Sequence, residues 1–217
     1  MWPQAGPGTR KALAHAVSLL RSDGAKVEVI ELPSEFAPLP EWYDIVLAWE
    51  GGVSFLSELR ANPKHLSKPL ADLAETRGGY SQLDYRKAVD GIMALRPCMD
   101  RFLGNFHAVL TPSAPDEAPQ GFATGSYAFC KIWSAMQGPV LHVPGFCGKS
   151  RMPIGLSLVA PRYMDAQLLA VGAPVGALFE AKGGWTRSVH QEQSVKLVGE
   201  GNGHREASNG LWIKGKL

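Results

Sequence analysis

Hydrophobic positions at the start of the chain change from a helical period to an alternating one. Leu13, Ala16, Val17 and Leu20 stand at i, i+3, i+4 and i+7, which predicts one apolar helix face, with Thr9 as its N-cap. Gly24 ends this helix, because glycine readily adopts the positive φ of a helix C-terminus. Residues 26–32 then alternate apolar and polar side chains up to Pro33. This alternation predicts a strand that is half exposed to solvent.

Helical spacing returns further along the chain. Helices are predicted over residues 40–60, where Gly51-Gly52 weakens the pattern, and over residues 66–75. Ser81 opens a long helix whose apolar side reaches Phe102 and which Pro97 should bend or interrupt. Shorter helical patterns cover residues 126–137 and 166–179; Asp165 caps the last of these helices and Pro174 kinks it.

Three short apolar runs predict buried strands. They cover residues 106–111, 140–143 and 154–159, and loops follow the first two at residues 112–119 and 144–153. Strands that alternate with helices indicate an α/β fold, here a mixed sheet covered by helices.

Composition changes after Trp185. Residues 186–217 contain few large apolar side chains and no clear period, so they are predicted to form a flexible tail next to a region at residues 1–185. Residues 183–187 should be the first site of limited proteolysis. Because the tail offers little burial, its removal should leave the melting temperature unchanged.

Charge and composition exclude several classes of protein. Hydrophobic residues make up 45% of the 217 residues and charged residues 19%, which excludes an intrinsically disordered chain. A net charge of +2 without a basic cluster gives no electrostatic argument for nucleic-acid binding. No apolar run is long enough for a membrane span, and the N-terminus lacks the apolar stretch of a signal peptide. Three cysteines without short ligand-like spacing favour a reducing, cytoplasmic setting over a disulfide scaffold or a zinc site.

Five segments, in order and spacing, resemble the amidase signature family of carbon–nitrogen hydrolases, as found in fungal and bacterial amidases. The clearest is the strand and proline-rich loop at residues 110–119. The others are the helix, turn and strand at residues 133–144, the strand at 152–161, the helix that follows Asp165, and residues 179–185, which are similar to the end of several family members. Upstream, residues 25–33 resemble the family's helix-to-strand entry. The resemblance covers residues 2–185 and implies the C-terminal half of the amidase signature fold.

The family's chemistry resides in its other half. There a nucleophilic serine, a second serine and a lysine cooperate, and backbone N–H groups stabilise the oxyanion. This sequence has no comparable Gly- and Ser-rich run, so no catalytic residue is assigned. The resemblance implies a truncated protein derived from a hydrolase of small carboxamides, inactive alone and without a cofactor or metal. The alternative is a non-catalytic chain, either a pairing subunit or an inert product.

Other serines offer weaker candidates for a nucleophile. The string nearest to the family signature is Gly51-Gly-Val-Ser54, which lies in a helical context with no lysine strand before it. No Gly-x-Ser-x-Gly pentapeptide occurs, and Ser157 occupies one position of an apolar strand.

Histidines and cysteines are assigned mainly to packing. The six histidines have no metal-like pairing, and His107 and His142 are predicted as hydrogen-bonded core residues rather than catalytic ones. Cys130 and Cys147 have no local base that would activate a thiolate. Lys149 and Arg151 are predicted in a solvated loop.

Substrate binding is assigned to Thr124, Tyr127 and Trp133. The resemblance places the loop after the proline-rich stretch, and the helix that follows it, along the acyl side of the family's pocket. An amide substrate needs an apolar wall with a few polar contacts, which these three residues could supply. The competing interpretation is that the Trp and Tyr lie in a helix core. The small amide would bind only if the missing half were supplied.

The resemblance also implies one sheet that crosses both halves of the family fold. A chain holding one half would expose a strand edge and the apolar surface beside it. Low solubility or self-association is therefore expected.

Overall fold

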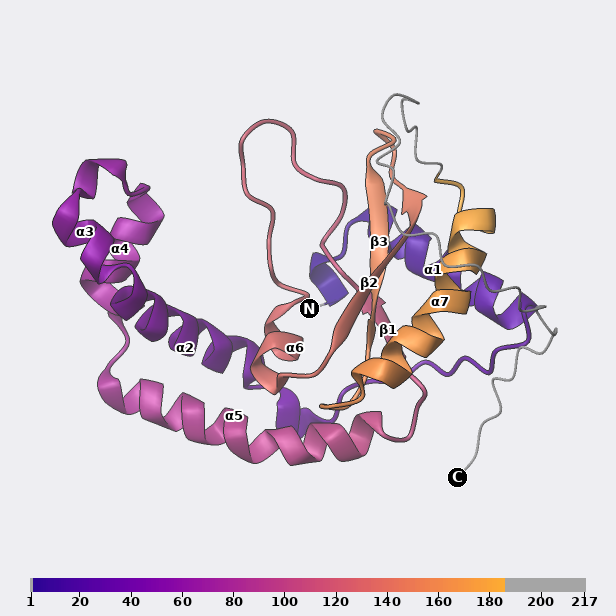
Figure 1. The fold of residues 1–217 in the computed structure, drawn as a ribbon, viewed down its shortest axis with the longest axis horizontal. Coiled ribbons are helices and arrows are strands. Elements are labelled where there is room, and N and C mark those ends of the chain that lie inside the picture. Colours follow the sequence, from indigo (N-terminus) through magenta and orange to yellow (C-terminus); the bar gives the residue numbers. More distant parts are fainter. Residues whose placement is uncertain (1, 186–217) are drawn as a thin grey trace, which may run out of the picture.

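The computed structural model describes residues 2–185, which form an α/β fold (Figure 1). Its first part is helical: α1 (Pro7–Ser22), α2 (Leu39–Ser54), α3 (Leu56–Ala61), α4 (Lys68–Thr76) and α5 (Gln82–Leu103). The second part is β1 (Val109–Pro112), α6 (Lys131–Met136), β2 (Val140–Cys147), β3 (Pro153–Val159) and α7 (Asp165–Lys182). Short 3₁₀ turns occur at Trp2–Gln4, Ser34–Phe36, Pro63–His65 and Arg77–Gly79.

The three strands form one sheet in the order β1-β3-β2, and both pairings are antiparallel. The prediction of a mixed sheet is therefore wrong for the described strands, although the α/β class with covering helices is confirmed. The reason is topological. The chain crosses from β1 through α6 to β2, so β1 and β2 run parallel, but the β2–β3 hairpin places β3 between them.

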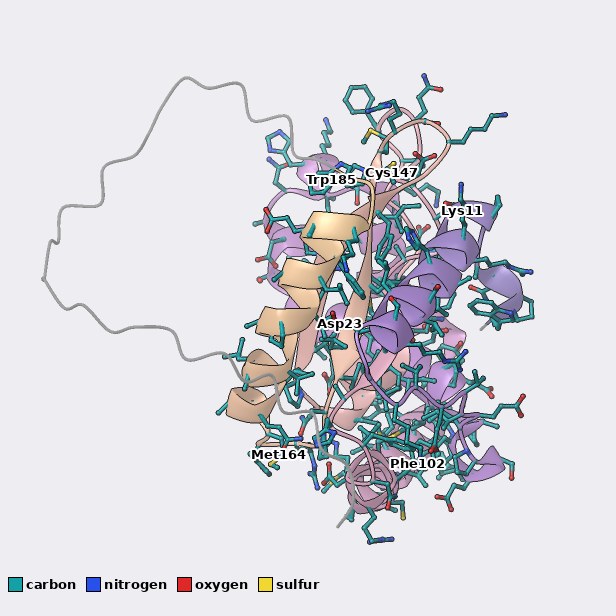
Figure 2. The ribbon with its side chains drawn as sticks, turned by 90° about the vertical axis from the view of Figure 1, so that its right-hand side faces the viewer. Lys11, Asp23, Phe102, Cys147, Met164 and Trp185 are labelled. Atoms are coloured by element: carbon teal, nitrogen blue, oxygen red, sulfur yellow. The ribbon has the colours of Figure 1, made fainter. Side chains whose placement is uncertain are left out.

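Helices α1 and α7 lie side by side over one face of the sheet (Figure 2). Leucines of β3 and aromatic side chains of β2 and α7 fill the space beneath them, with Leu156 and Phe179 fully buried. At one end of the opposite face, α5 and α6 pack over Val159 around a second apolar cluster. The rest of that opposite face carries no helix of the described chain.

A helical arm extends away from the sheet (Figure 1). Its two long helices, α2 and α5, lie along each other, and α3 and α4 form its outer end. Gly51 allows α4 to approach α2, because a β-carbon there would meet the Leu73 side chain. Ser81 and Asp84 form a capping box that starts α5, as the sequence predicts for Ser81, and Pro97 lies inside the helix.

Several boundaries differ from the sequence-based predictions. Residues 26–32 are neither helix nor strand, so that predicted strand is wrong. The β2 strand continues through Pro144 to Cys147, because an edge strand can tolerate a proline that donates no ladder hydrogen bond. Helix α6 covers only the second half of residues 126–137.

Predicted helix caps also differ. The N-cap of α1 is Gly6, and Thr9 is buried with its hydroxyl bonded to the Ala114 carbonyl. Asp165 begins α7 after the N-cap Met164. The predicted tail at residues 186–217 lies outside the described residues.

Candidate functional site

Strand register brings polar side chains together on the uncovered face of the sheet. Ser157 of β3 pairs with Thr111 of β1 on one side and with His142 of β2 on the other. Successive residues of a strand point to opposite faces. Because Leu156 and Leu158 point toward α1 and α7, Ser157 and its two partners point away from those helices.

Ser113, His142 and Ser157 form a hydrogen-bonded cluster, called here the polar row. The Ser113 Oγ atom lies 2.8 Å from His142 Nδ1 and 2.7 Å from Ser157 Oγ. A hydroxyl has one hydrogen to donate. When the His142 ring carries its hydrogen on Nε2, its Nδ1 accepts a hydrogen bond. In that tautomer Ser113 donates to His142, and Ser157 donates to Ser113.

Burial and close packing hold the polar row in place. Ser157 is buried, at 6% exposure, Ser113 is half-buried, and His142 lies at the surface. The imidazole lies over Gly155, where a β-carbon would collide with the ring. Partial burial lowers the pKa of His142 from its ordinary value, because shielding from water disfavours the imidazolium form. The imidazole is therefore neutral at pH 7 and able to accept the Ser113 hydrogen.

The loop that carries Ser113 is anchored to distant parts of the chain. Thr9 donates to the Ala114 carbonyl over 3.2 Å, and the Gly6 N–H donates to the Pro115 carbonyl over 2.7 Å. Asp116 accepts the Gly8 N–H over 3.2 Å at the positive end of the α1 dipole, where a carboxylate is favourable. The start of α1 thus fixes the position of this loop relative to the sheet.

Glu117 anchors the same loop to the β2–β3 hairpin. Its carboxylate accepts the backbone N–H groups of Ser150 and Met152, with Oε1 at 3.0 and 2.9 Å respectively. The turn is exposed and contains Lys149 and Arg151, as predicted for a solvated loop. Arg151 has a positive φ of 61° there.

Tyr127, one of the three predicted substrate-binding residues, is held against the helical arm. Its hydroxyl donates to Asp44 Oδ1 of α2 over 3.4 Å, and its ring lies 6.2 Å from the Tyr43 ring. Lys131 of α6 forms an ion pair with Asp44 Oδ2 at 2.6 Å and lies 5.0 Å from the centre of the Tyr127 ring. Burial first, and then the charge of Asp44, raise the pKa of the Tyr127 phenol.

The other two predicted binding residues lie in different surroundings. Trp133 is 5% exposed in the apolar cluster under α5 and α6, and its Nε1 has no hydrogen-bond partner within residues 2–185. Thr124 is exposed on the loop between β1 and α6. Their role in substrate binding stays a prediction.

The remaining candidates from the sequence lie in varied surroundings. Ser54 ends α2 and donates to the Glu50 carbonyl of its own helix. His107 is exposed, so its assignment to the core is wrong, because it lies in the turn before β1. His142 is also outside the core, on the uncovered face of its strand. Cys130 is exposed, and its thiol lies 3.6 Å from the Ser113 carbonyl.

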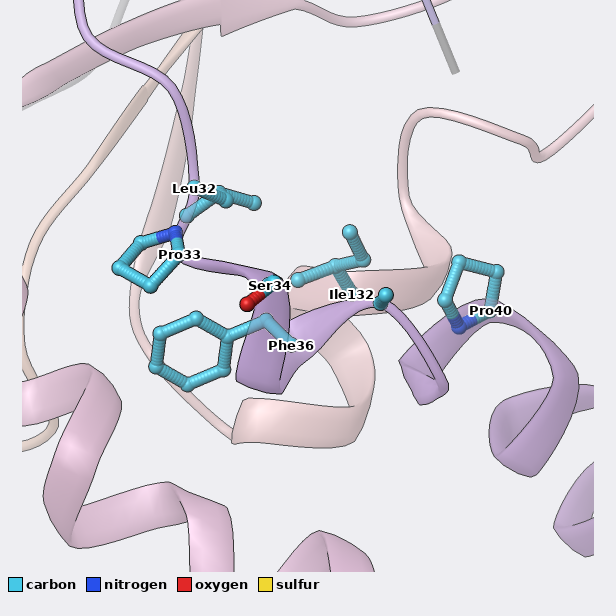
Figure 3. A pocket seen from close by; sticks show the side chains of 7 residues that line it. Leu32, Pro33, Ser34, Phe36, Pro40 and Ile132 are labelled. Atoms are coloured by element: carbon cyan, nitrogen blue, oxygen red, sulfur yellow. The ribbon is translucent and has the colours of Figure 1, made fainter.

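Two surface hollows lie away from the polar row. One, of about 340 Å³, is lined mostly by apolar residues of the segment before α2, together with Pro40 of α2 and Ile132 of α6 (Figure 3). The other, of about 320 Å³, lies between α2 and α5 and is lined by Trp49, Glu50, Val53, Ser54 and Tyr85. Neither hollow is lined by Thr124, Tyr127 or Trp133.

Grouped metal ligands and membrane-spanning helices do not occur in the described part of the chain. Within residues 2–185, no three His, Cys, Asp or Glu side chains gather in a way that could hold a metal ion. No helix in this range combines the length and apolar character required to cross a membrane.

Comparison with known proteins gives one relationship in sequence and several in fold. No family model matches the chain. A glutamyl-tRNA(Gln) amidotransferase subunit of Streptomyces coelicolor is 23% identical over 214 residues, an alignment that covers 82% of this chain and 42% of that protein. The chain thus spans less than half the length of this relative.

Solved structures match a similar share of this chain and of their own length. A crystal structure described as an amidase matches with a TM-score of 0.71 and 25% identity, over 83% of this chain and 43% of that one. A structure of a vestigial protein complex linked to the origins of an s-triazine catabolic enzyme matches in fold, with a TM-score of 0.67, 21% identity, and 83% and 40% coverage. The chain therefore has the fold of part of an amidase signature protein, and the resemblance inferred from its sequence motifs is confirmed.

Proposed function

We propose that this chain, which resembles part of the amidase signature proteins in sequence and fold, is the C-terminal half of a carboxamide hydrolase. One observation carries this proposal. Similarity extends over 82% of this chain but only 42% of the relative's length, and the serine–serine–lysine set implied by the resemblance has no counterpart in the sequence. The chain alone should therefore not hydrolyse amides.

In this proposal the chain supplies the acyl-side wall of a substrate cleft. Tyr127 is the best supported wall residue, because Asp44 and Lys131 hold its ring from α2 and α6. Thr124 would contribute a hydroxyl from the preceding loop. Trp133 would support the wall from the core through α6. Neither the substrate nor the chemistry of the missing half follows from these contacts.

Amide hydrolysis by the purified chain is the direct test. Benzamide and a short aliphatic amide serve as substrates, with a mock purification as background and a fluorophosphonate probe for any reactive serine. We expect no turnover and no labelling. Turnover above the mock purification that disappears in Ser54→Ala would contradict the proposal, because the chain would then carry its own nucleophile.

Ligand binding tests the wall separately from catalysis. If the wall is formed without the other half, benzamide should perturb the NMR signals of Tyr127 and its neighbours, and Tyr127→Ala should remove the effect. Tyr163→Ala is the matched control, because Tyr163 is 89% exposed at the turn before α7. Equal loss of the benzamide effect in both variants would argue against a wall at Tyr127.

The second candidate is a non-catalytic subunit that pairs with another polypeptide. The uncovered face of the sheet favours it, because the polar row there lies under no helix of the described chain. Purification from the native host in a stable complex with a second amidase-like polypeptide would favour this candidate. Recovery of amide hydrolysis in that complex would instead support the hydrolase, with this chain as one half of the enzyme.

A further inference from the structure

The hollow between α2 and α5 combines an aromatic pair with a carboxylate. Trp49 of α2 and Tyr85 of α5 stack across the two helices, with ring centres 5.3 Å apart and ring planes inclined by 16°. Glu50, Val53 and Ser54 of α2 complete the lining. The two helices run along each other in the arm (Figure 1). At about 320 Å³, the hollow has the size of a site for a small molecule.

The side chains that line this hollow already use all of their hydrogen-bond donors. The Trp49 indole N–H donates to the Tyr80 carbonyl over 3.0 Å. The Ser54 hydroxyl donates to the Glu50 carbonyl over 2.8 Å, and the Tyr85 hydroxyl donates to Glu50 Oε1 over 3.3 Å. Because each hydroxyl has one hydrogen, Ser54 and Tyr85 can offer a ligand only their lone pairs. The five lining side chains therefore present acceptors and no free donor.

The lining of the hollow carries a negative charge. Glu50 is exposed and forms no ion pair with a cation of residues 2–185. The Arg77 guanidinium lies 4.7 Å from the centre of the Trp49 ring, but the Arg77 side chain approaches α2 at Gly52. Since an α-helix turns by about 100° per residue, Gly52 and Glu50 lie on opposite sides of Trp49. Arg77 therefore leaves the Glu50 carboxylate without a counter-ion.

We propose that this hollow binds a small primary amine in its protonated form. An ammonium group has a positive charge and three N–H donors, which match the Glu50 carboxylate and the lone pairs of Ser54 and Tyr85. The apolar body of the amine would lie against Val53, whose side chain is 62% exposed. The neighbouring aromatic rings also attract a cation. A carboxylate or phosphate ligand is disfavoured, because it would be repelled by Glu50 and find no side-chain donor.

Binding should be weak and should decrease with salt. Glu50 is exposed, so dissolved ions screen its attraction for an ammonium group. This inference does not rest on the proposed function, because Thr124, Tyr127 and Trp133 do not line the hollow. The two proposals also call for different probes, since uncharged benzamide tests the wall at Tyr127 and a charged amine tests this hollow.

An NMR titration with benzylamine, at pH 7 and constant ionic strength, tests the site. The indole N–H signal of Trp49, assigned with Trp49→Phe, should shift progressively as benzylamine is added. Benzoate has the same ring with the opposite charge, and benzyl alcohol has it without a charge, so both should shift the signal much less. Benzyltrimethylammonium keeps the charge but has no N–H to donate. It should therefore bind roughly tenfold more weakly than benzylamine.

Substitutions in the lining test which groups hold the amine. Glu50→Gln should raise the benzylamine dissociation constant roughly tenfold, because it removes the charged acceptor. Glu41→Gln is the matched control, since it makes the same change at an exposed residue near the start of the same helix. Ser54→Ala removes one neutral acceptor and should raise the dissociation constant roughly threefold. Both glutamates are exposed, so the thermal melts of their variants should match that of the parent chain.

Four outcomes would overturn the proposal. Two concern the parent chain: a Trp49 signal that benzylamine does not shift at any concentration up to its solubility limit, or one that benzoate shifts equally. The third is unchanged benzylamine binding in Glu50→Gln. The fourth is equal binding of benzyltrimethylammonium, because contact between a cation and the rings would then be sufficient. A benzamide effect at Tyr127 without a benzylamine effect at Trp49 would refute this inference and leave the proposed function intact.

Discussion

The two faces of the β1-β3-β2 sheet differ in the contacts that adjacent residues of β3 make. On one face, Leu156 is fully buried beneath α1 and α7. On the other, the adjacent Ser157 forms a 2.7 Å hydrogen bond to Ser113, which in turn is bonded to His142. The comparison indicates that the first face supplies most of the stability. The second face contributes hydrogen bonds, and these bonds depend on the stability of the first face to keep the strands aligned.

Leu156→Ala should have the largest effect. The change removes a fully buried side chain from the covered face, and comparable substitutions cost about 2–5 kcal/mol because a cavity remains. Chemical denaturation followed by circular dichroism measures the loss. Leu169→Ala on α7, where the side chain is 61% exposed, is the control and should change stability by less than about 0.5 kcal/mol. Similar losses in both variants would contradict the proposed division between the faces.

Gly155→Ala should be the next most damaging. A β-carbon at residue 155 would collide with the His142 imidazole and approach the Val143 carbonyl, so the ring or the strand must shift. Overpacking of this kind costs about 1–3 kcal/mol. Gly176→Ala on α7 is a suitable control, because its added β-carbon would lie at an ordinary 3.9 Å from Val143. A melt unchanged by Gly155→Ala would show that the imidazole does not lie over the strand.

Ser157→Ala should cost about 1 kcal/mol, the usual net contribution of a buried hydrogen bond. Its coupling to Ser113→Ala, measured in a double-mutant cycle, should differ from zero because the two hydroxyls interact directly. Additive losses would mean that the polar row does not act as a connected unit.

The pH dependence of stability should show the smallest effect. Burial lowers the pKa of His142 in the folded chain, so the unfolded chain binds a proton more readily below the ordinary pKa of about 6.5. The resulting stabilisation is complete above that pH and is lost as the pH falls through the folded-state pKa. The free energy of unfolding, measured by chemical denaturation between pH 7 and pH 5, should therefore depend less steeply on pH in His142→Asn than in the parent chain. The same slope in the parent and in His142→Asn would refute this assignment, and His107→Asn controls for a histidine outside the row.

Local sequence signals were sufficient for some elements. The alternation and apolar character of residues 154–159 predicted β3 closely, and Ser81 marked the start of α5, where a capping box forms. Both signals depend on residues close together in the chain. The strand predicted at residues 26–32 was wrong because alternation gives a strand's propensity but cannot supply its partner.

The site was harder to predict because its contacts join distant positions. Ser113 is 29 residues from His142 and 44 from Ser157, and no short motif reports such contacts. Asp44 and Lys131 were not singled out either, since their pairing spans 87 residues. The alternation within β2 and β3 could have assigned His142 and Ser157 to one face, but only strand order makes them neighbours.

The position of β3 between β1 and β2 has a consequence for synthesis on the ribosome. β1 and β2 emerge first, yet neither pairs with the other, because their common partner is encoded last among the three strands. Until residues 153–159 leave the exit tunnel, both strands carry unpaired backbone groups on the nascent chain. The sheet must therefore assemble late, and until then the unpaired strands expose the growing chain to aggregation.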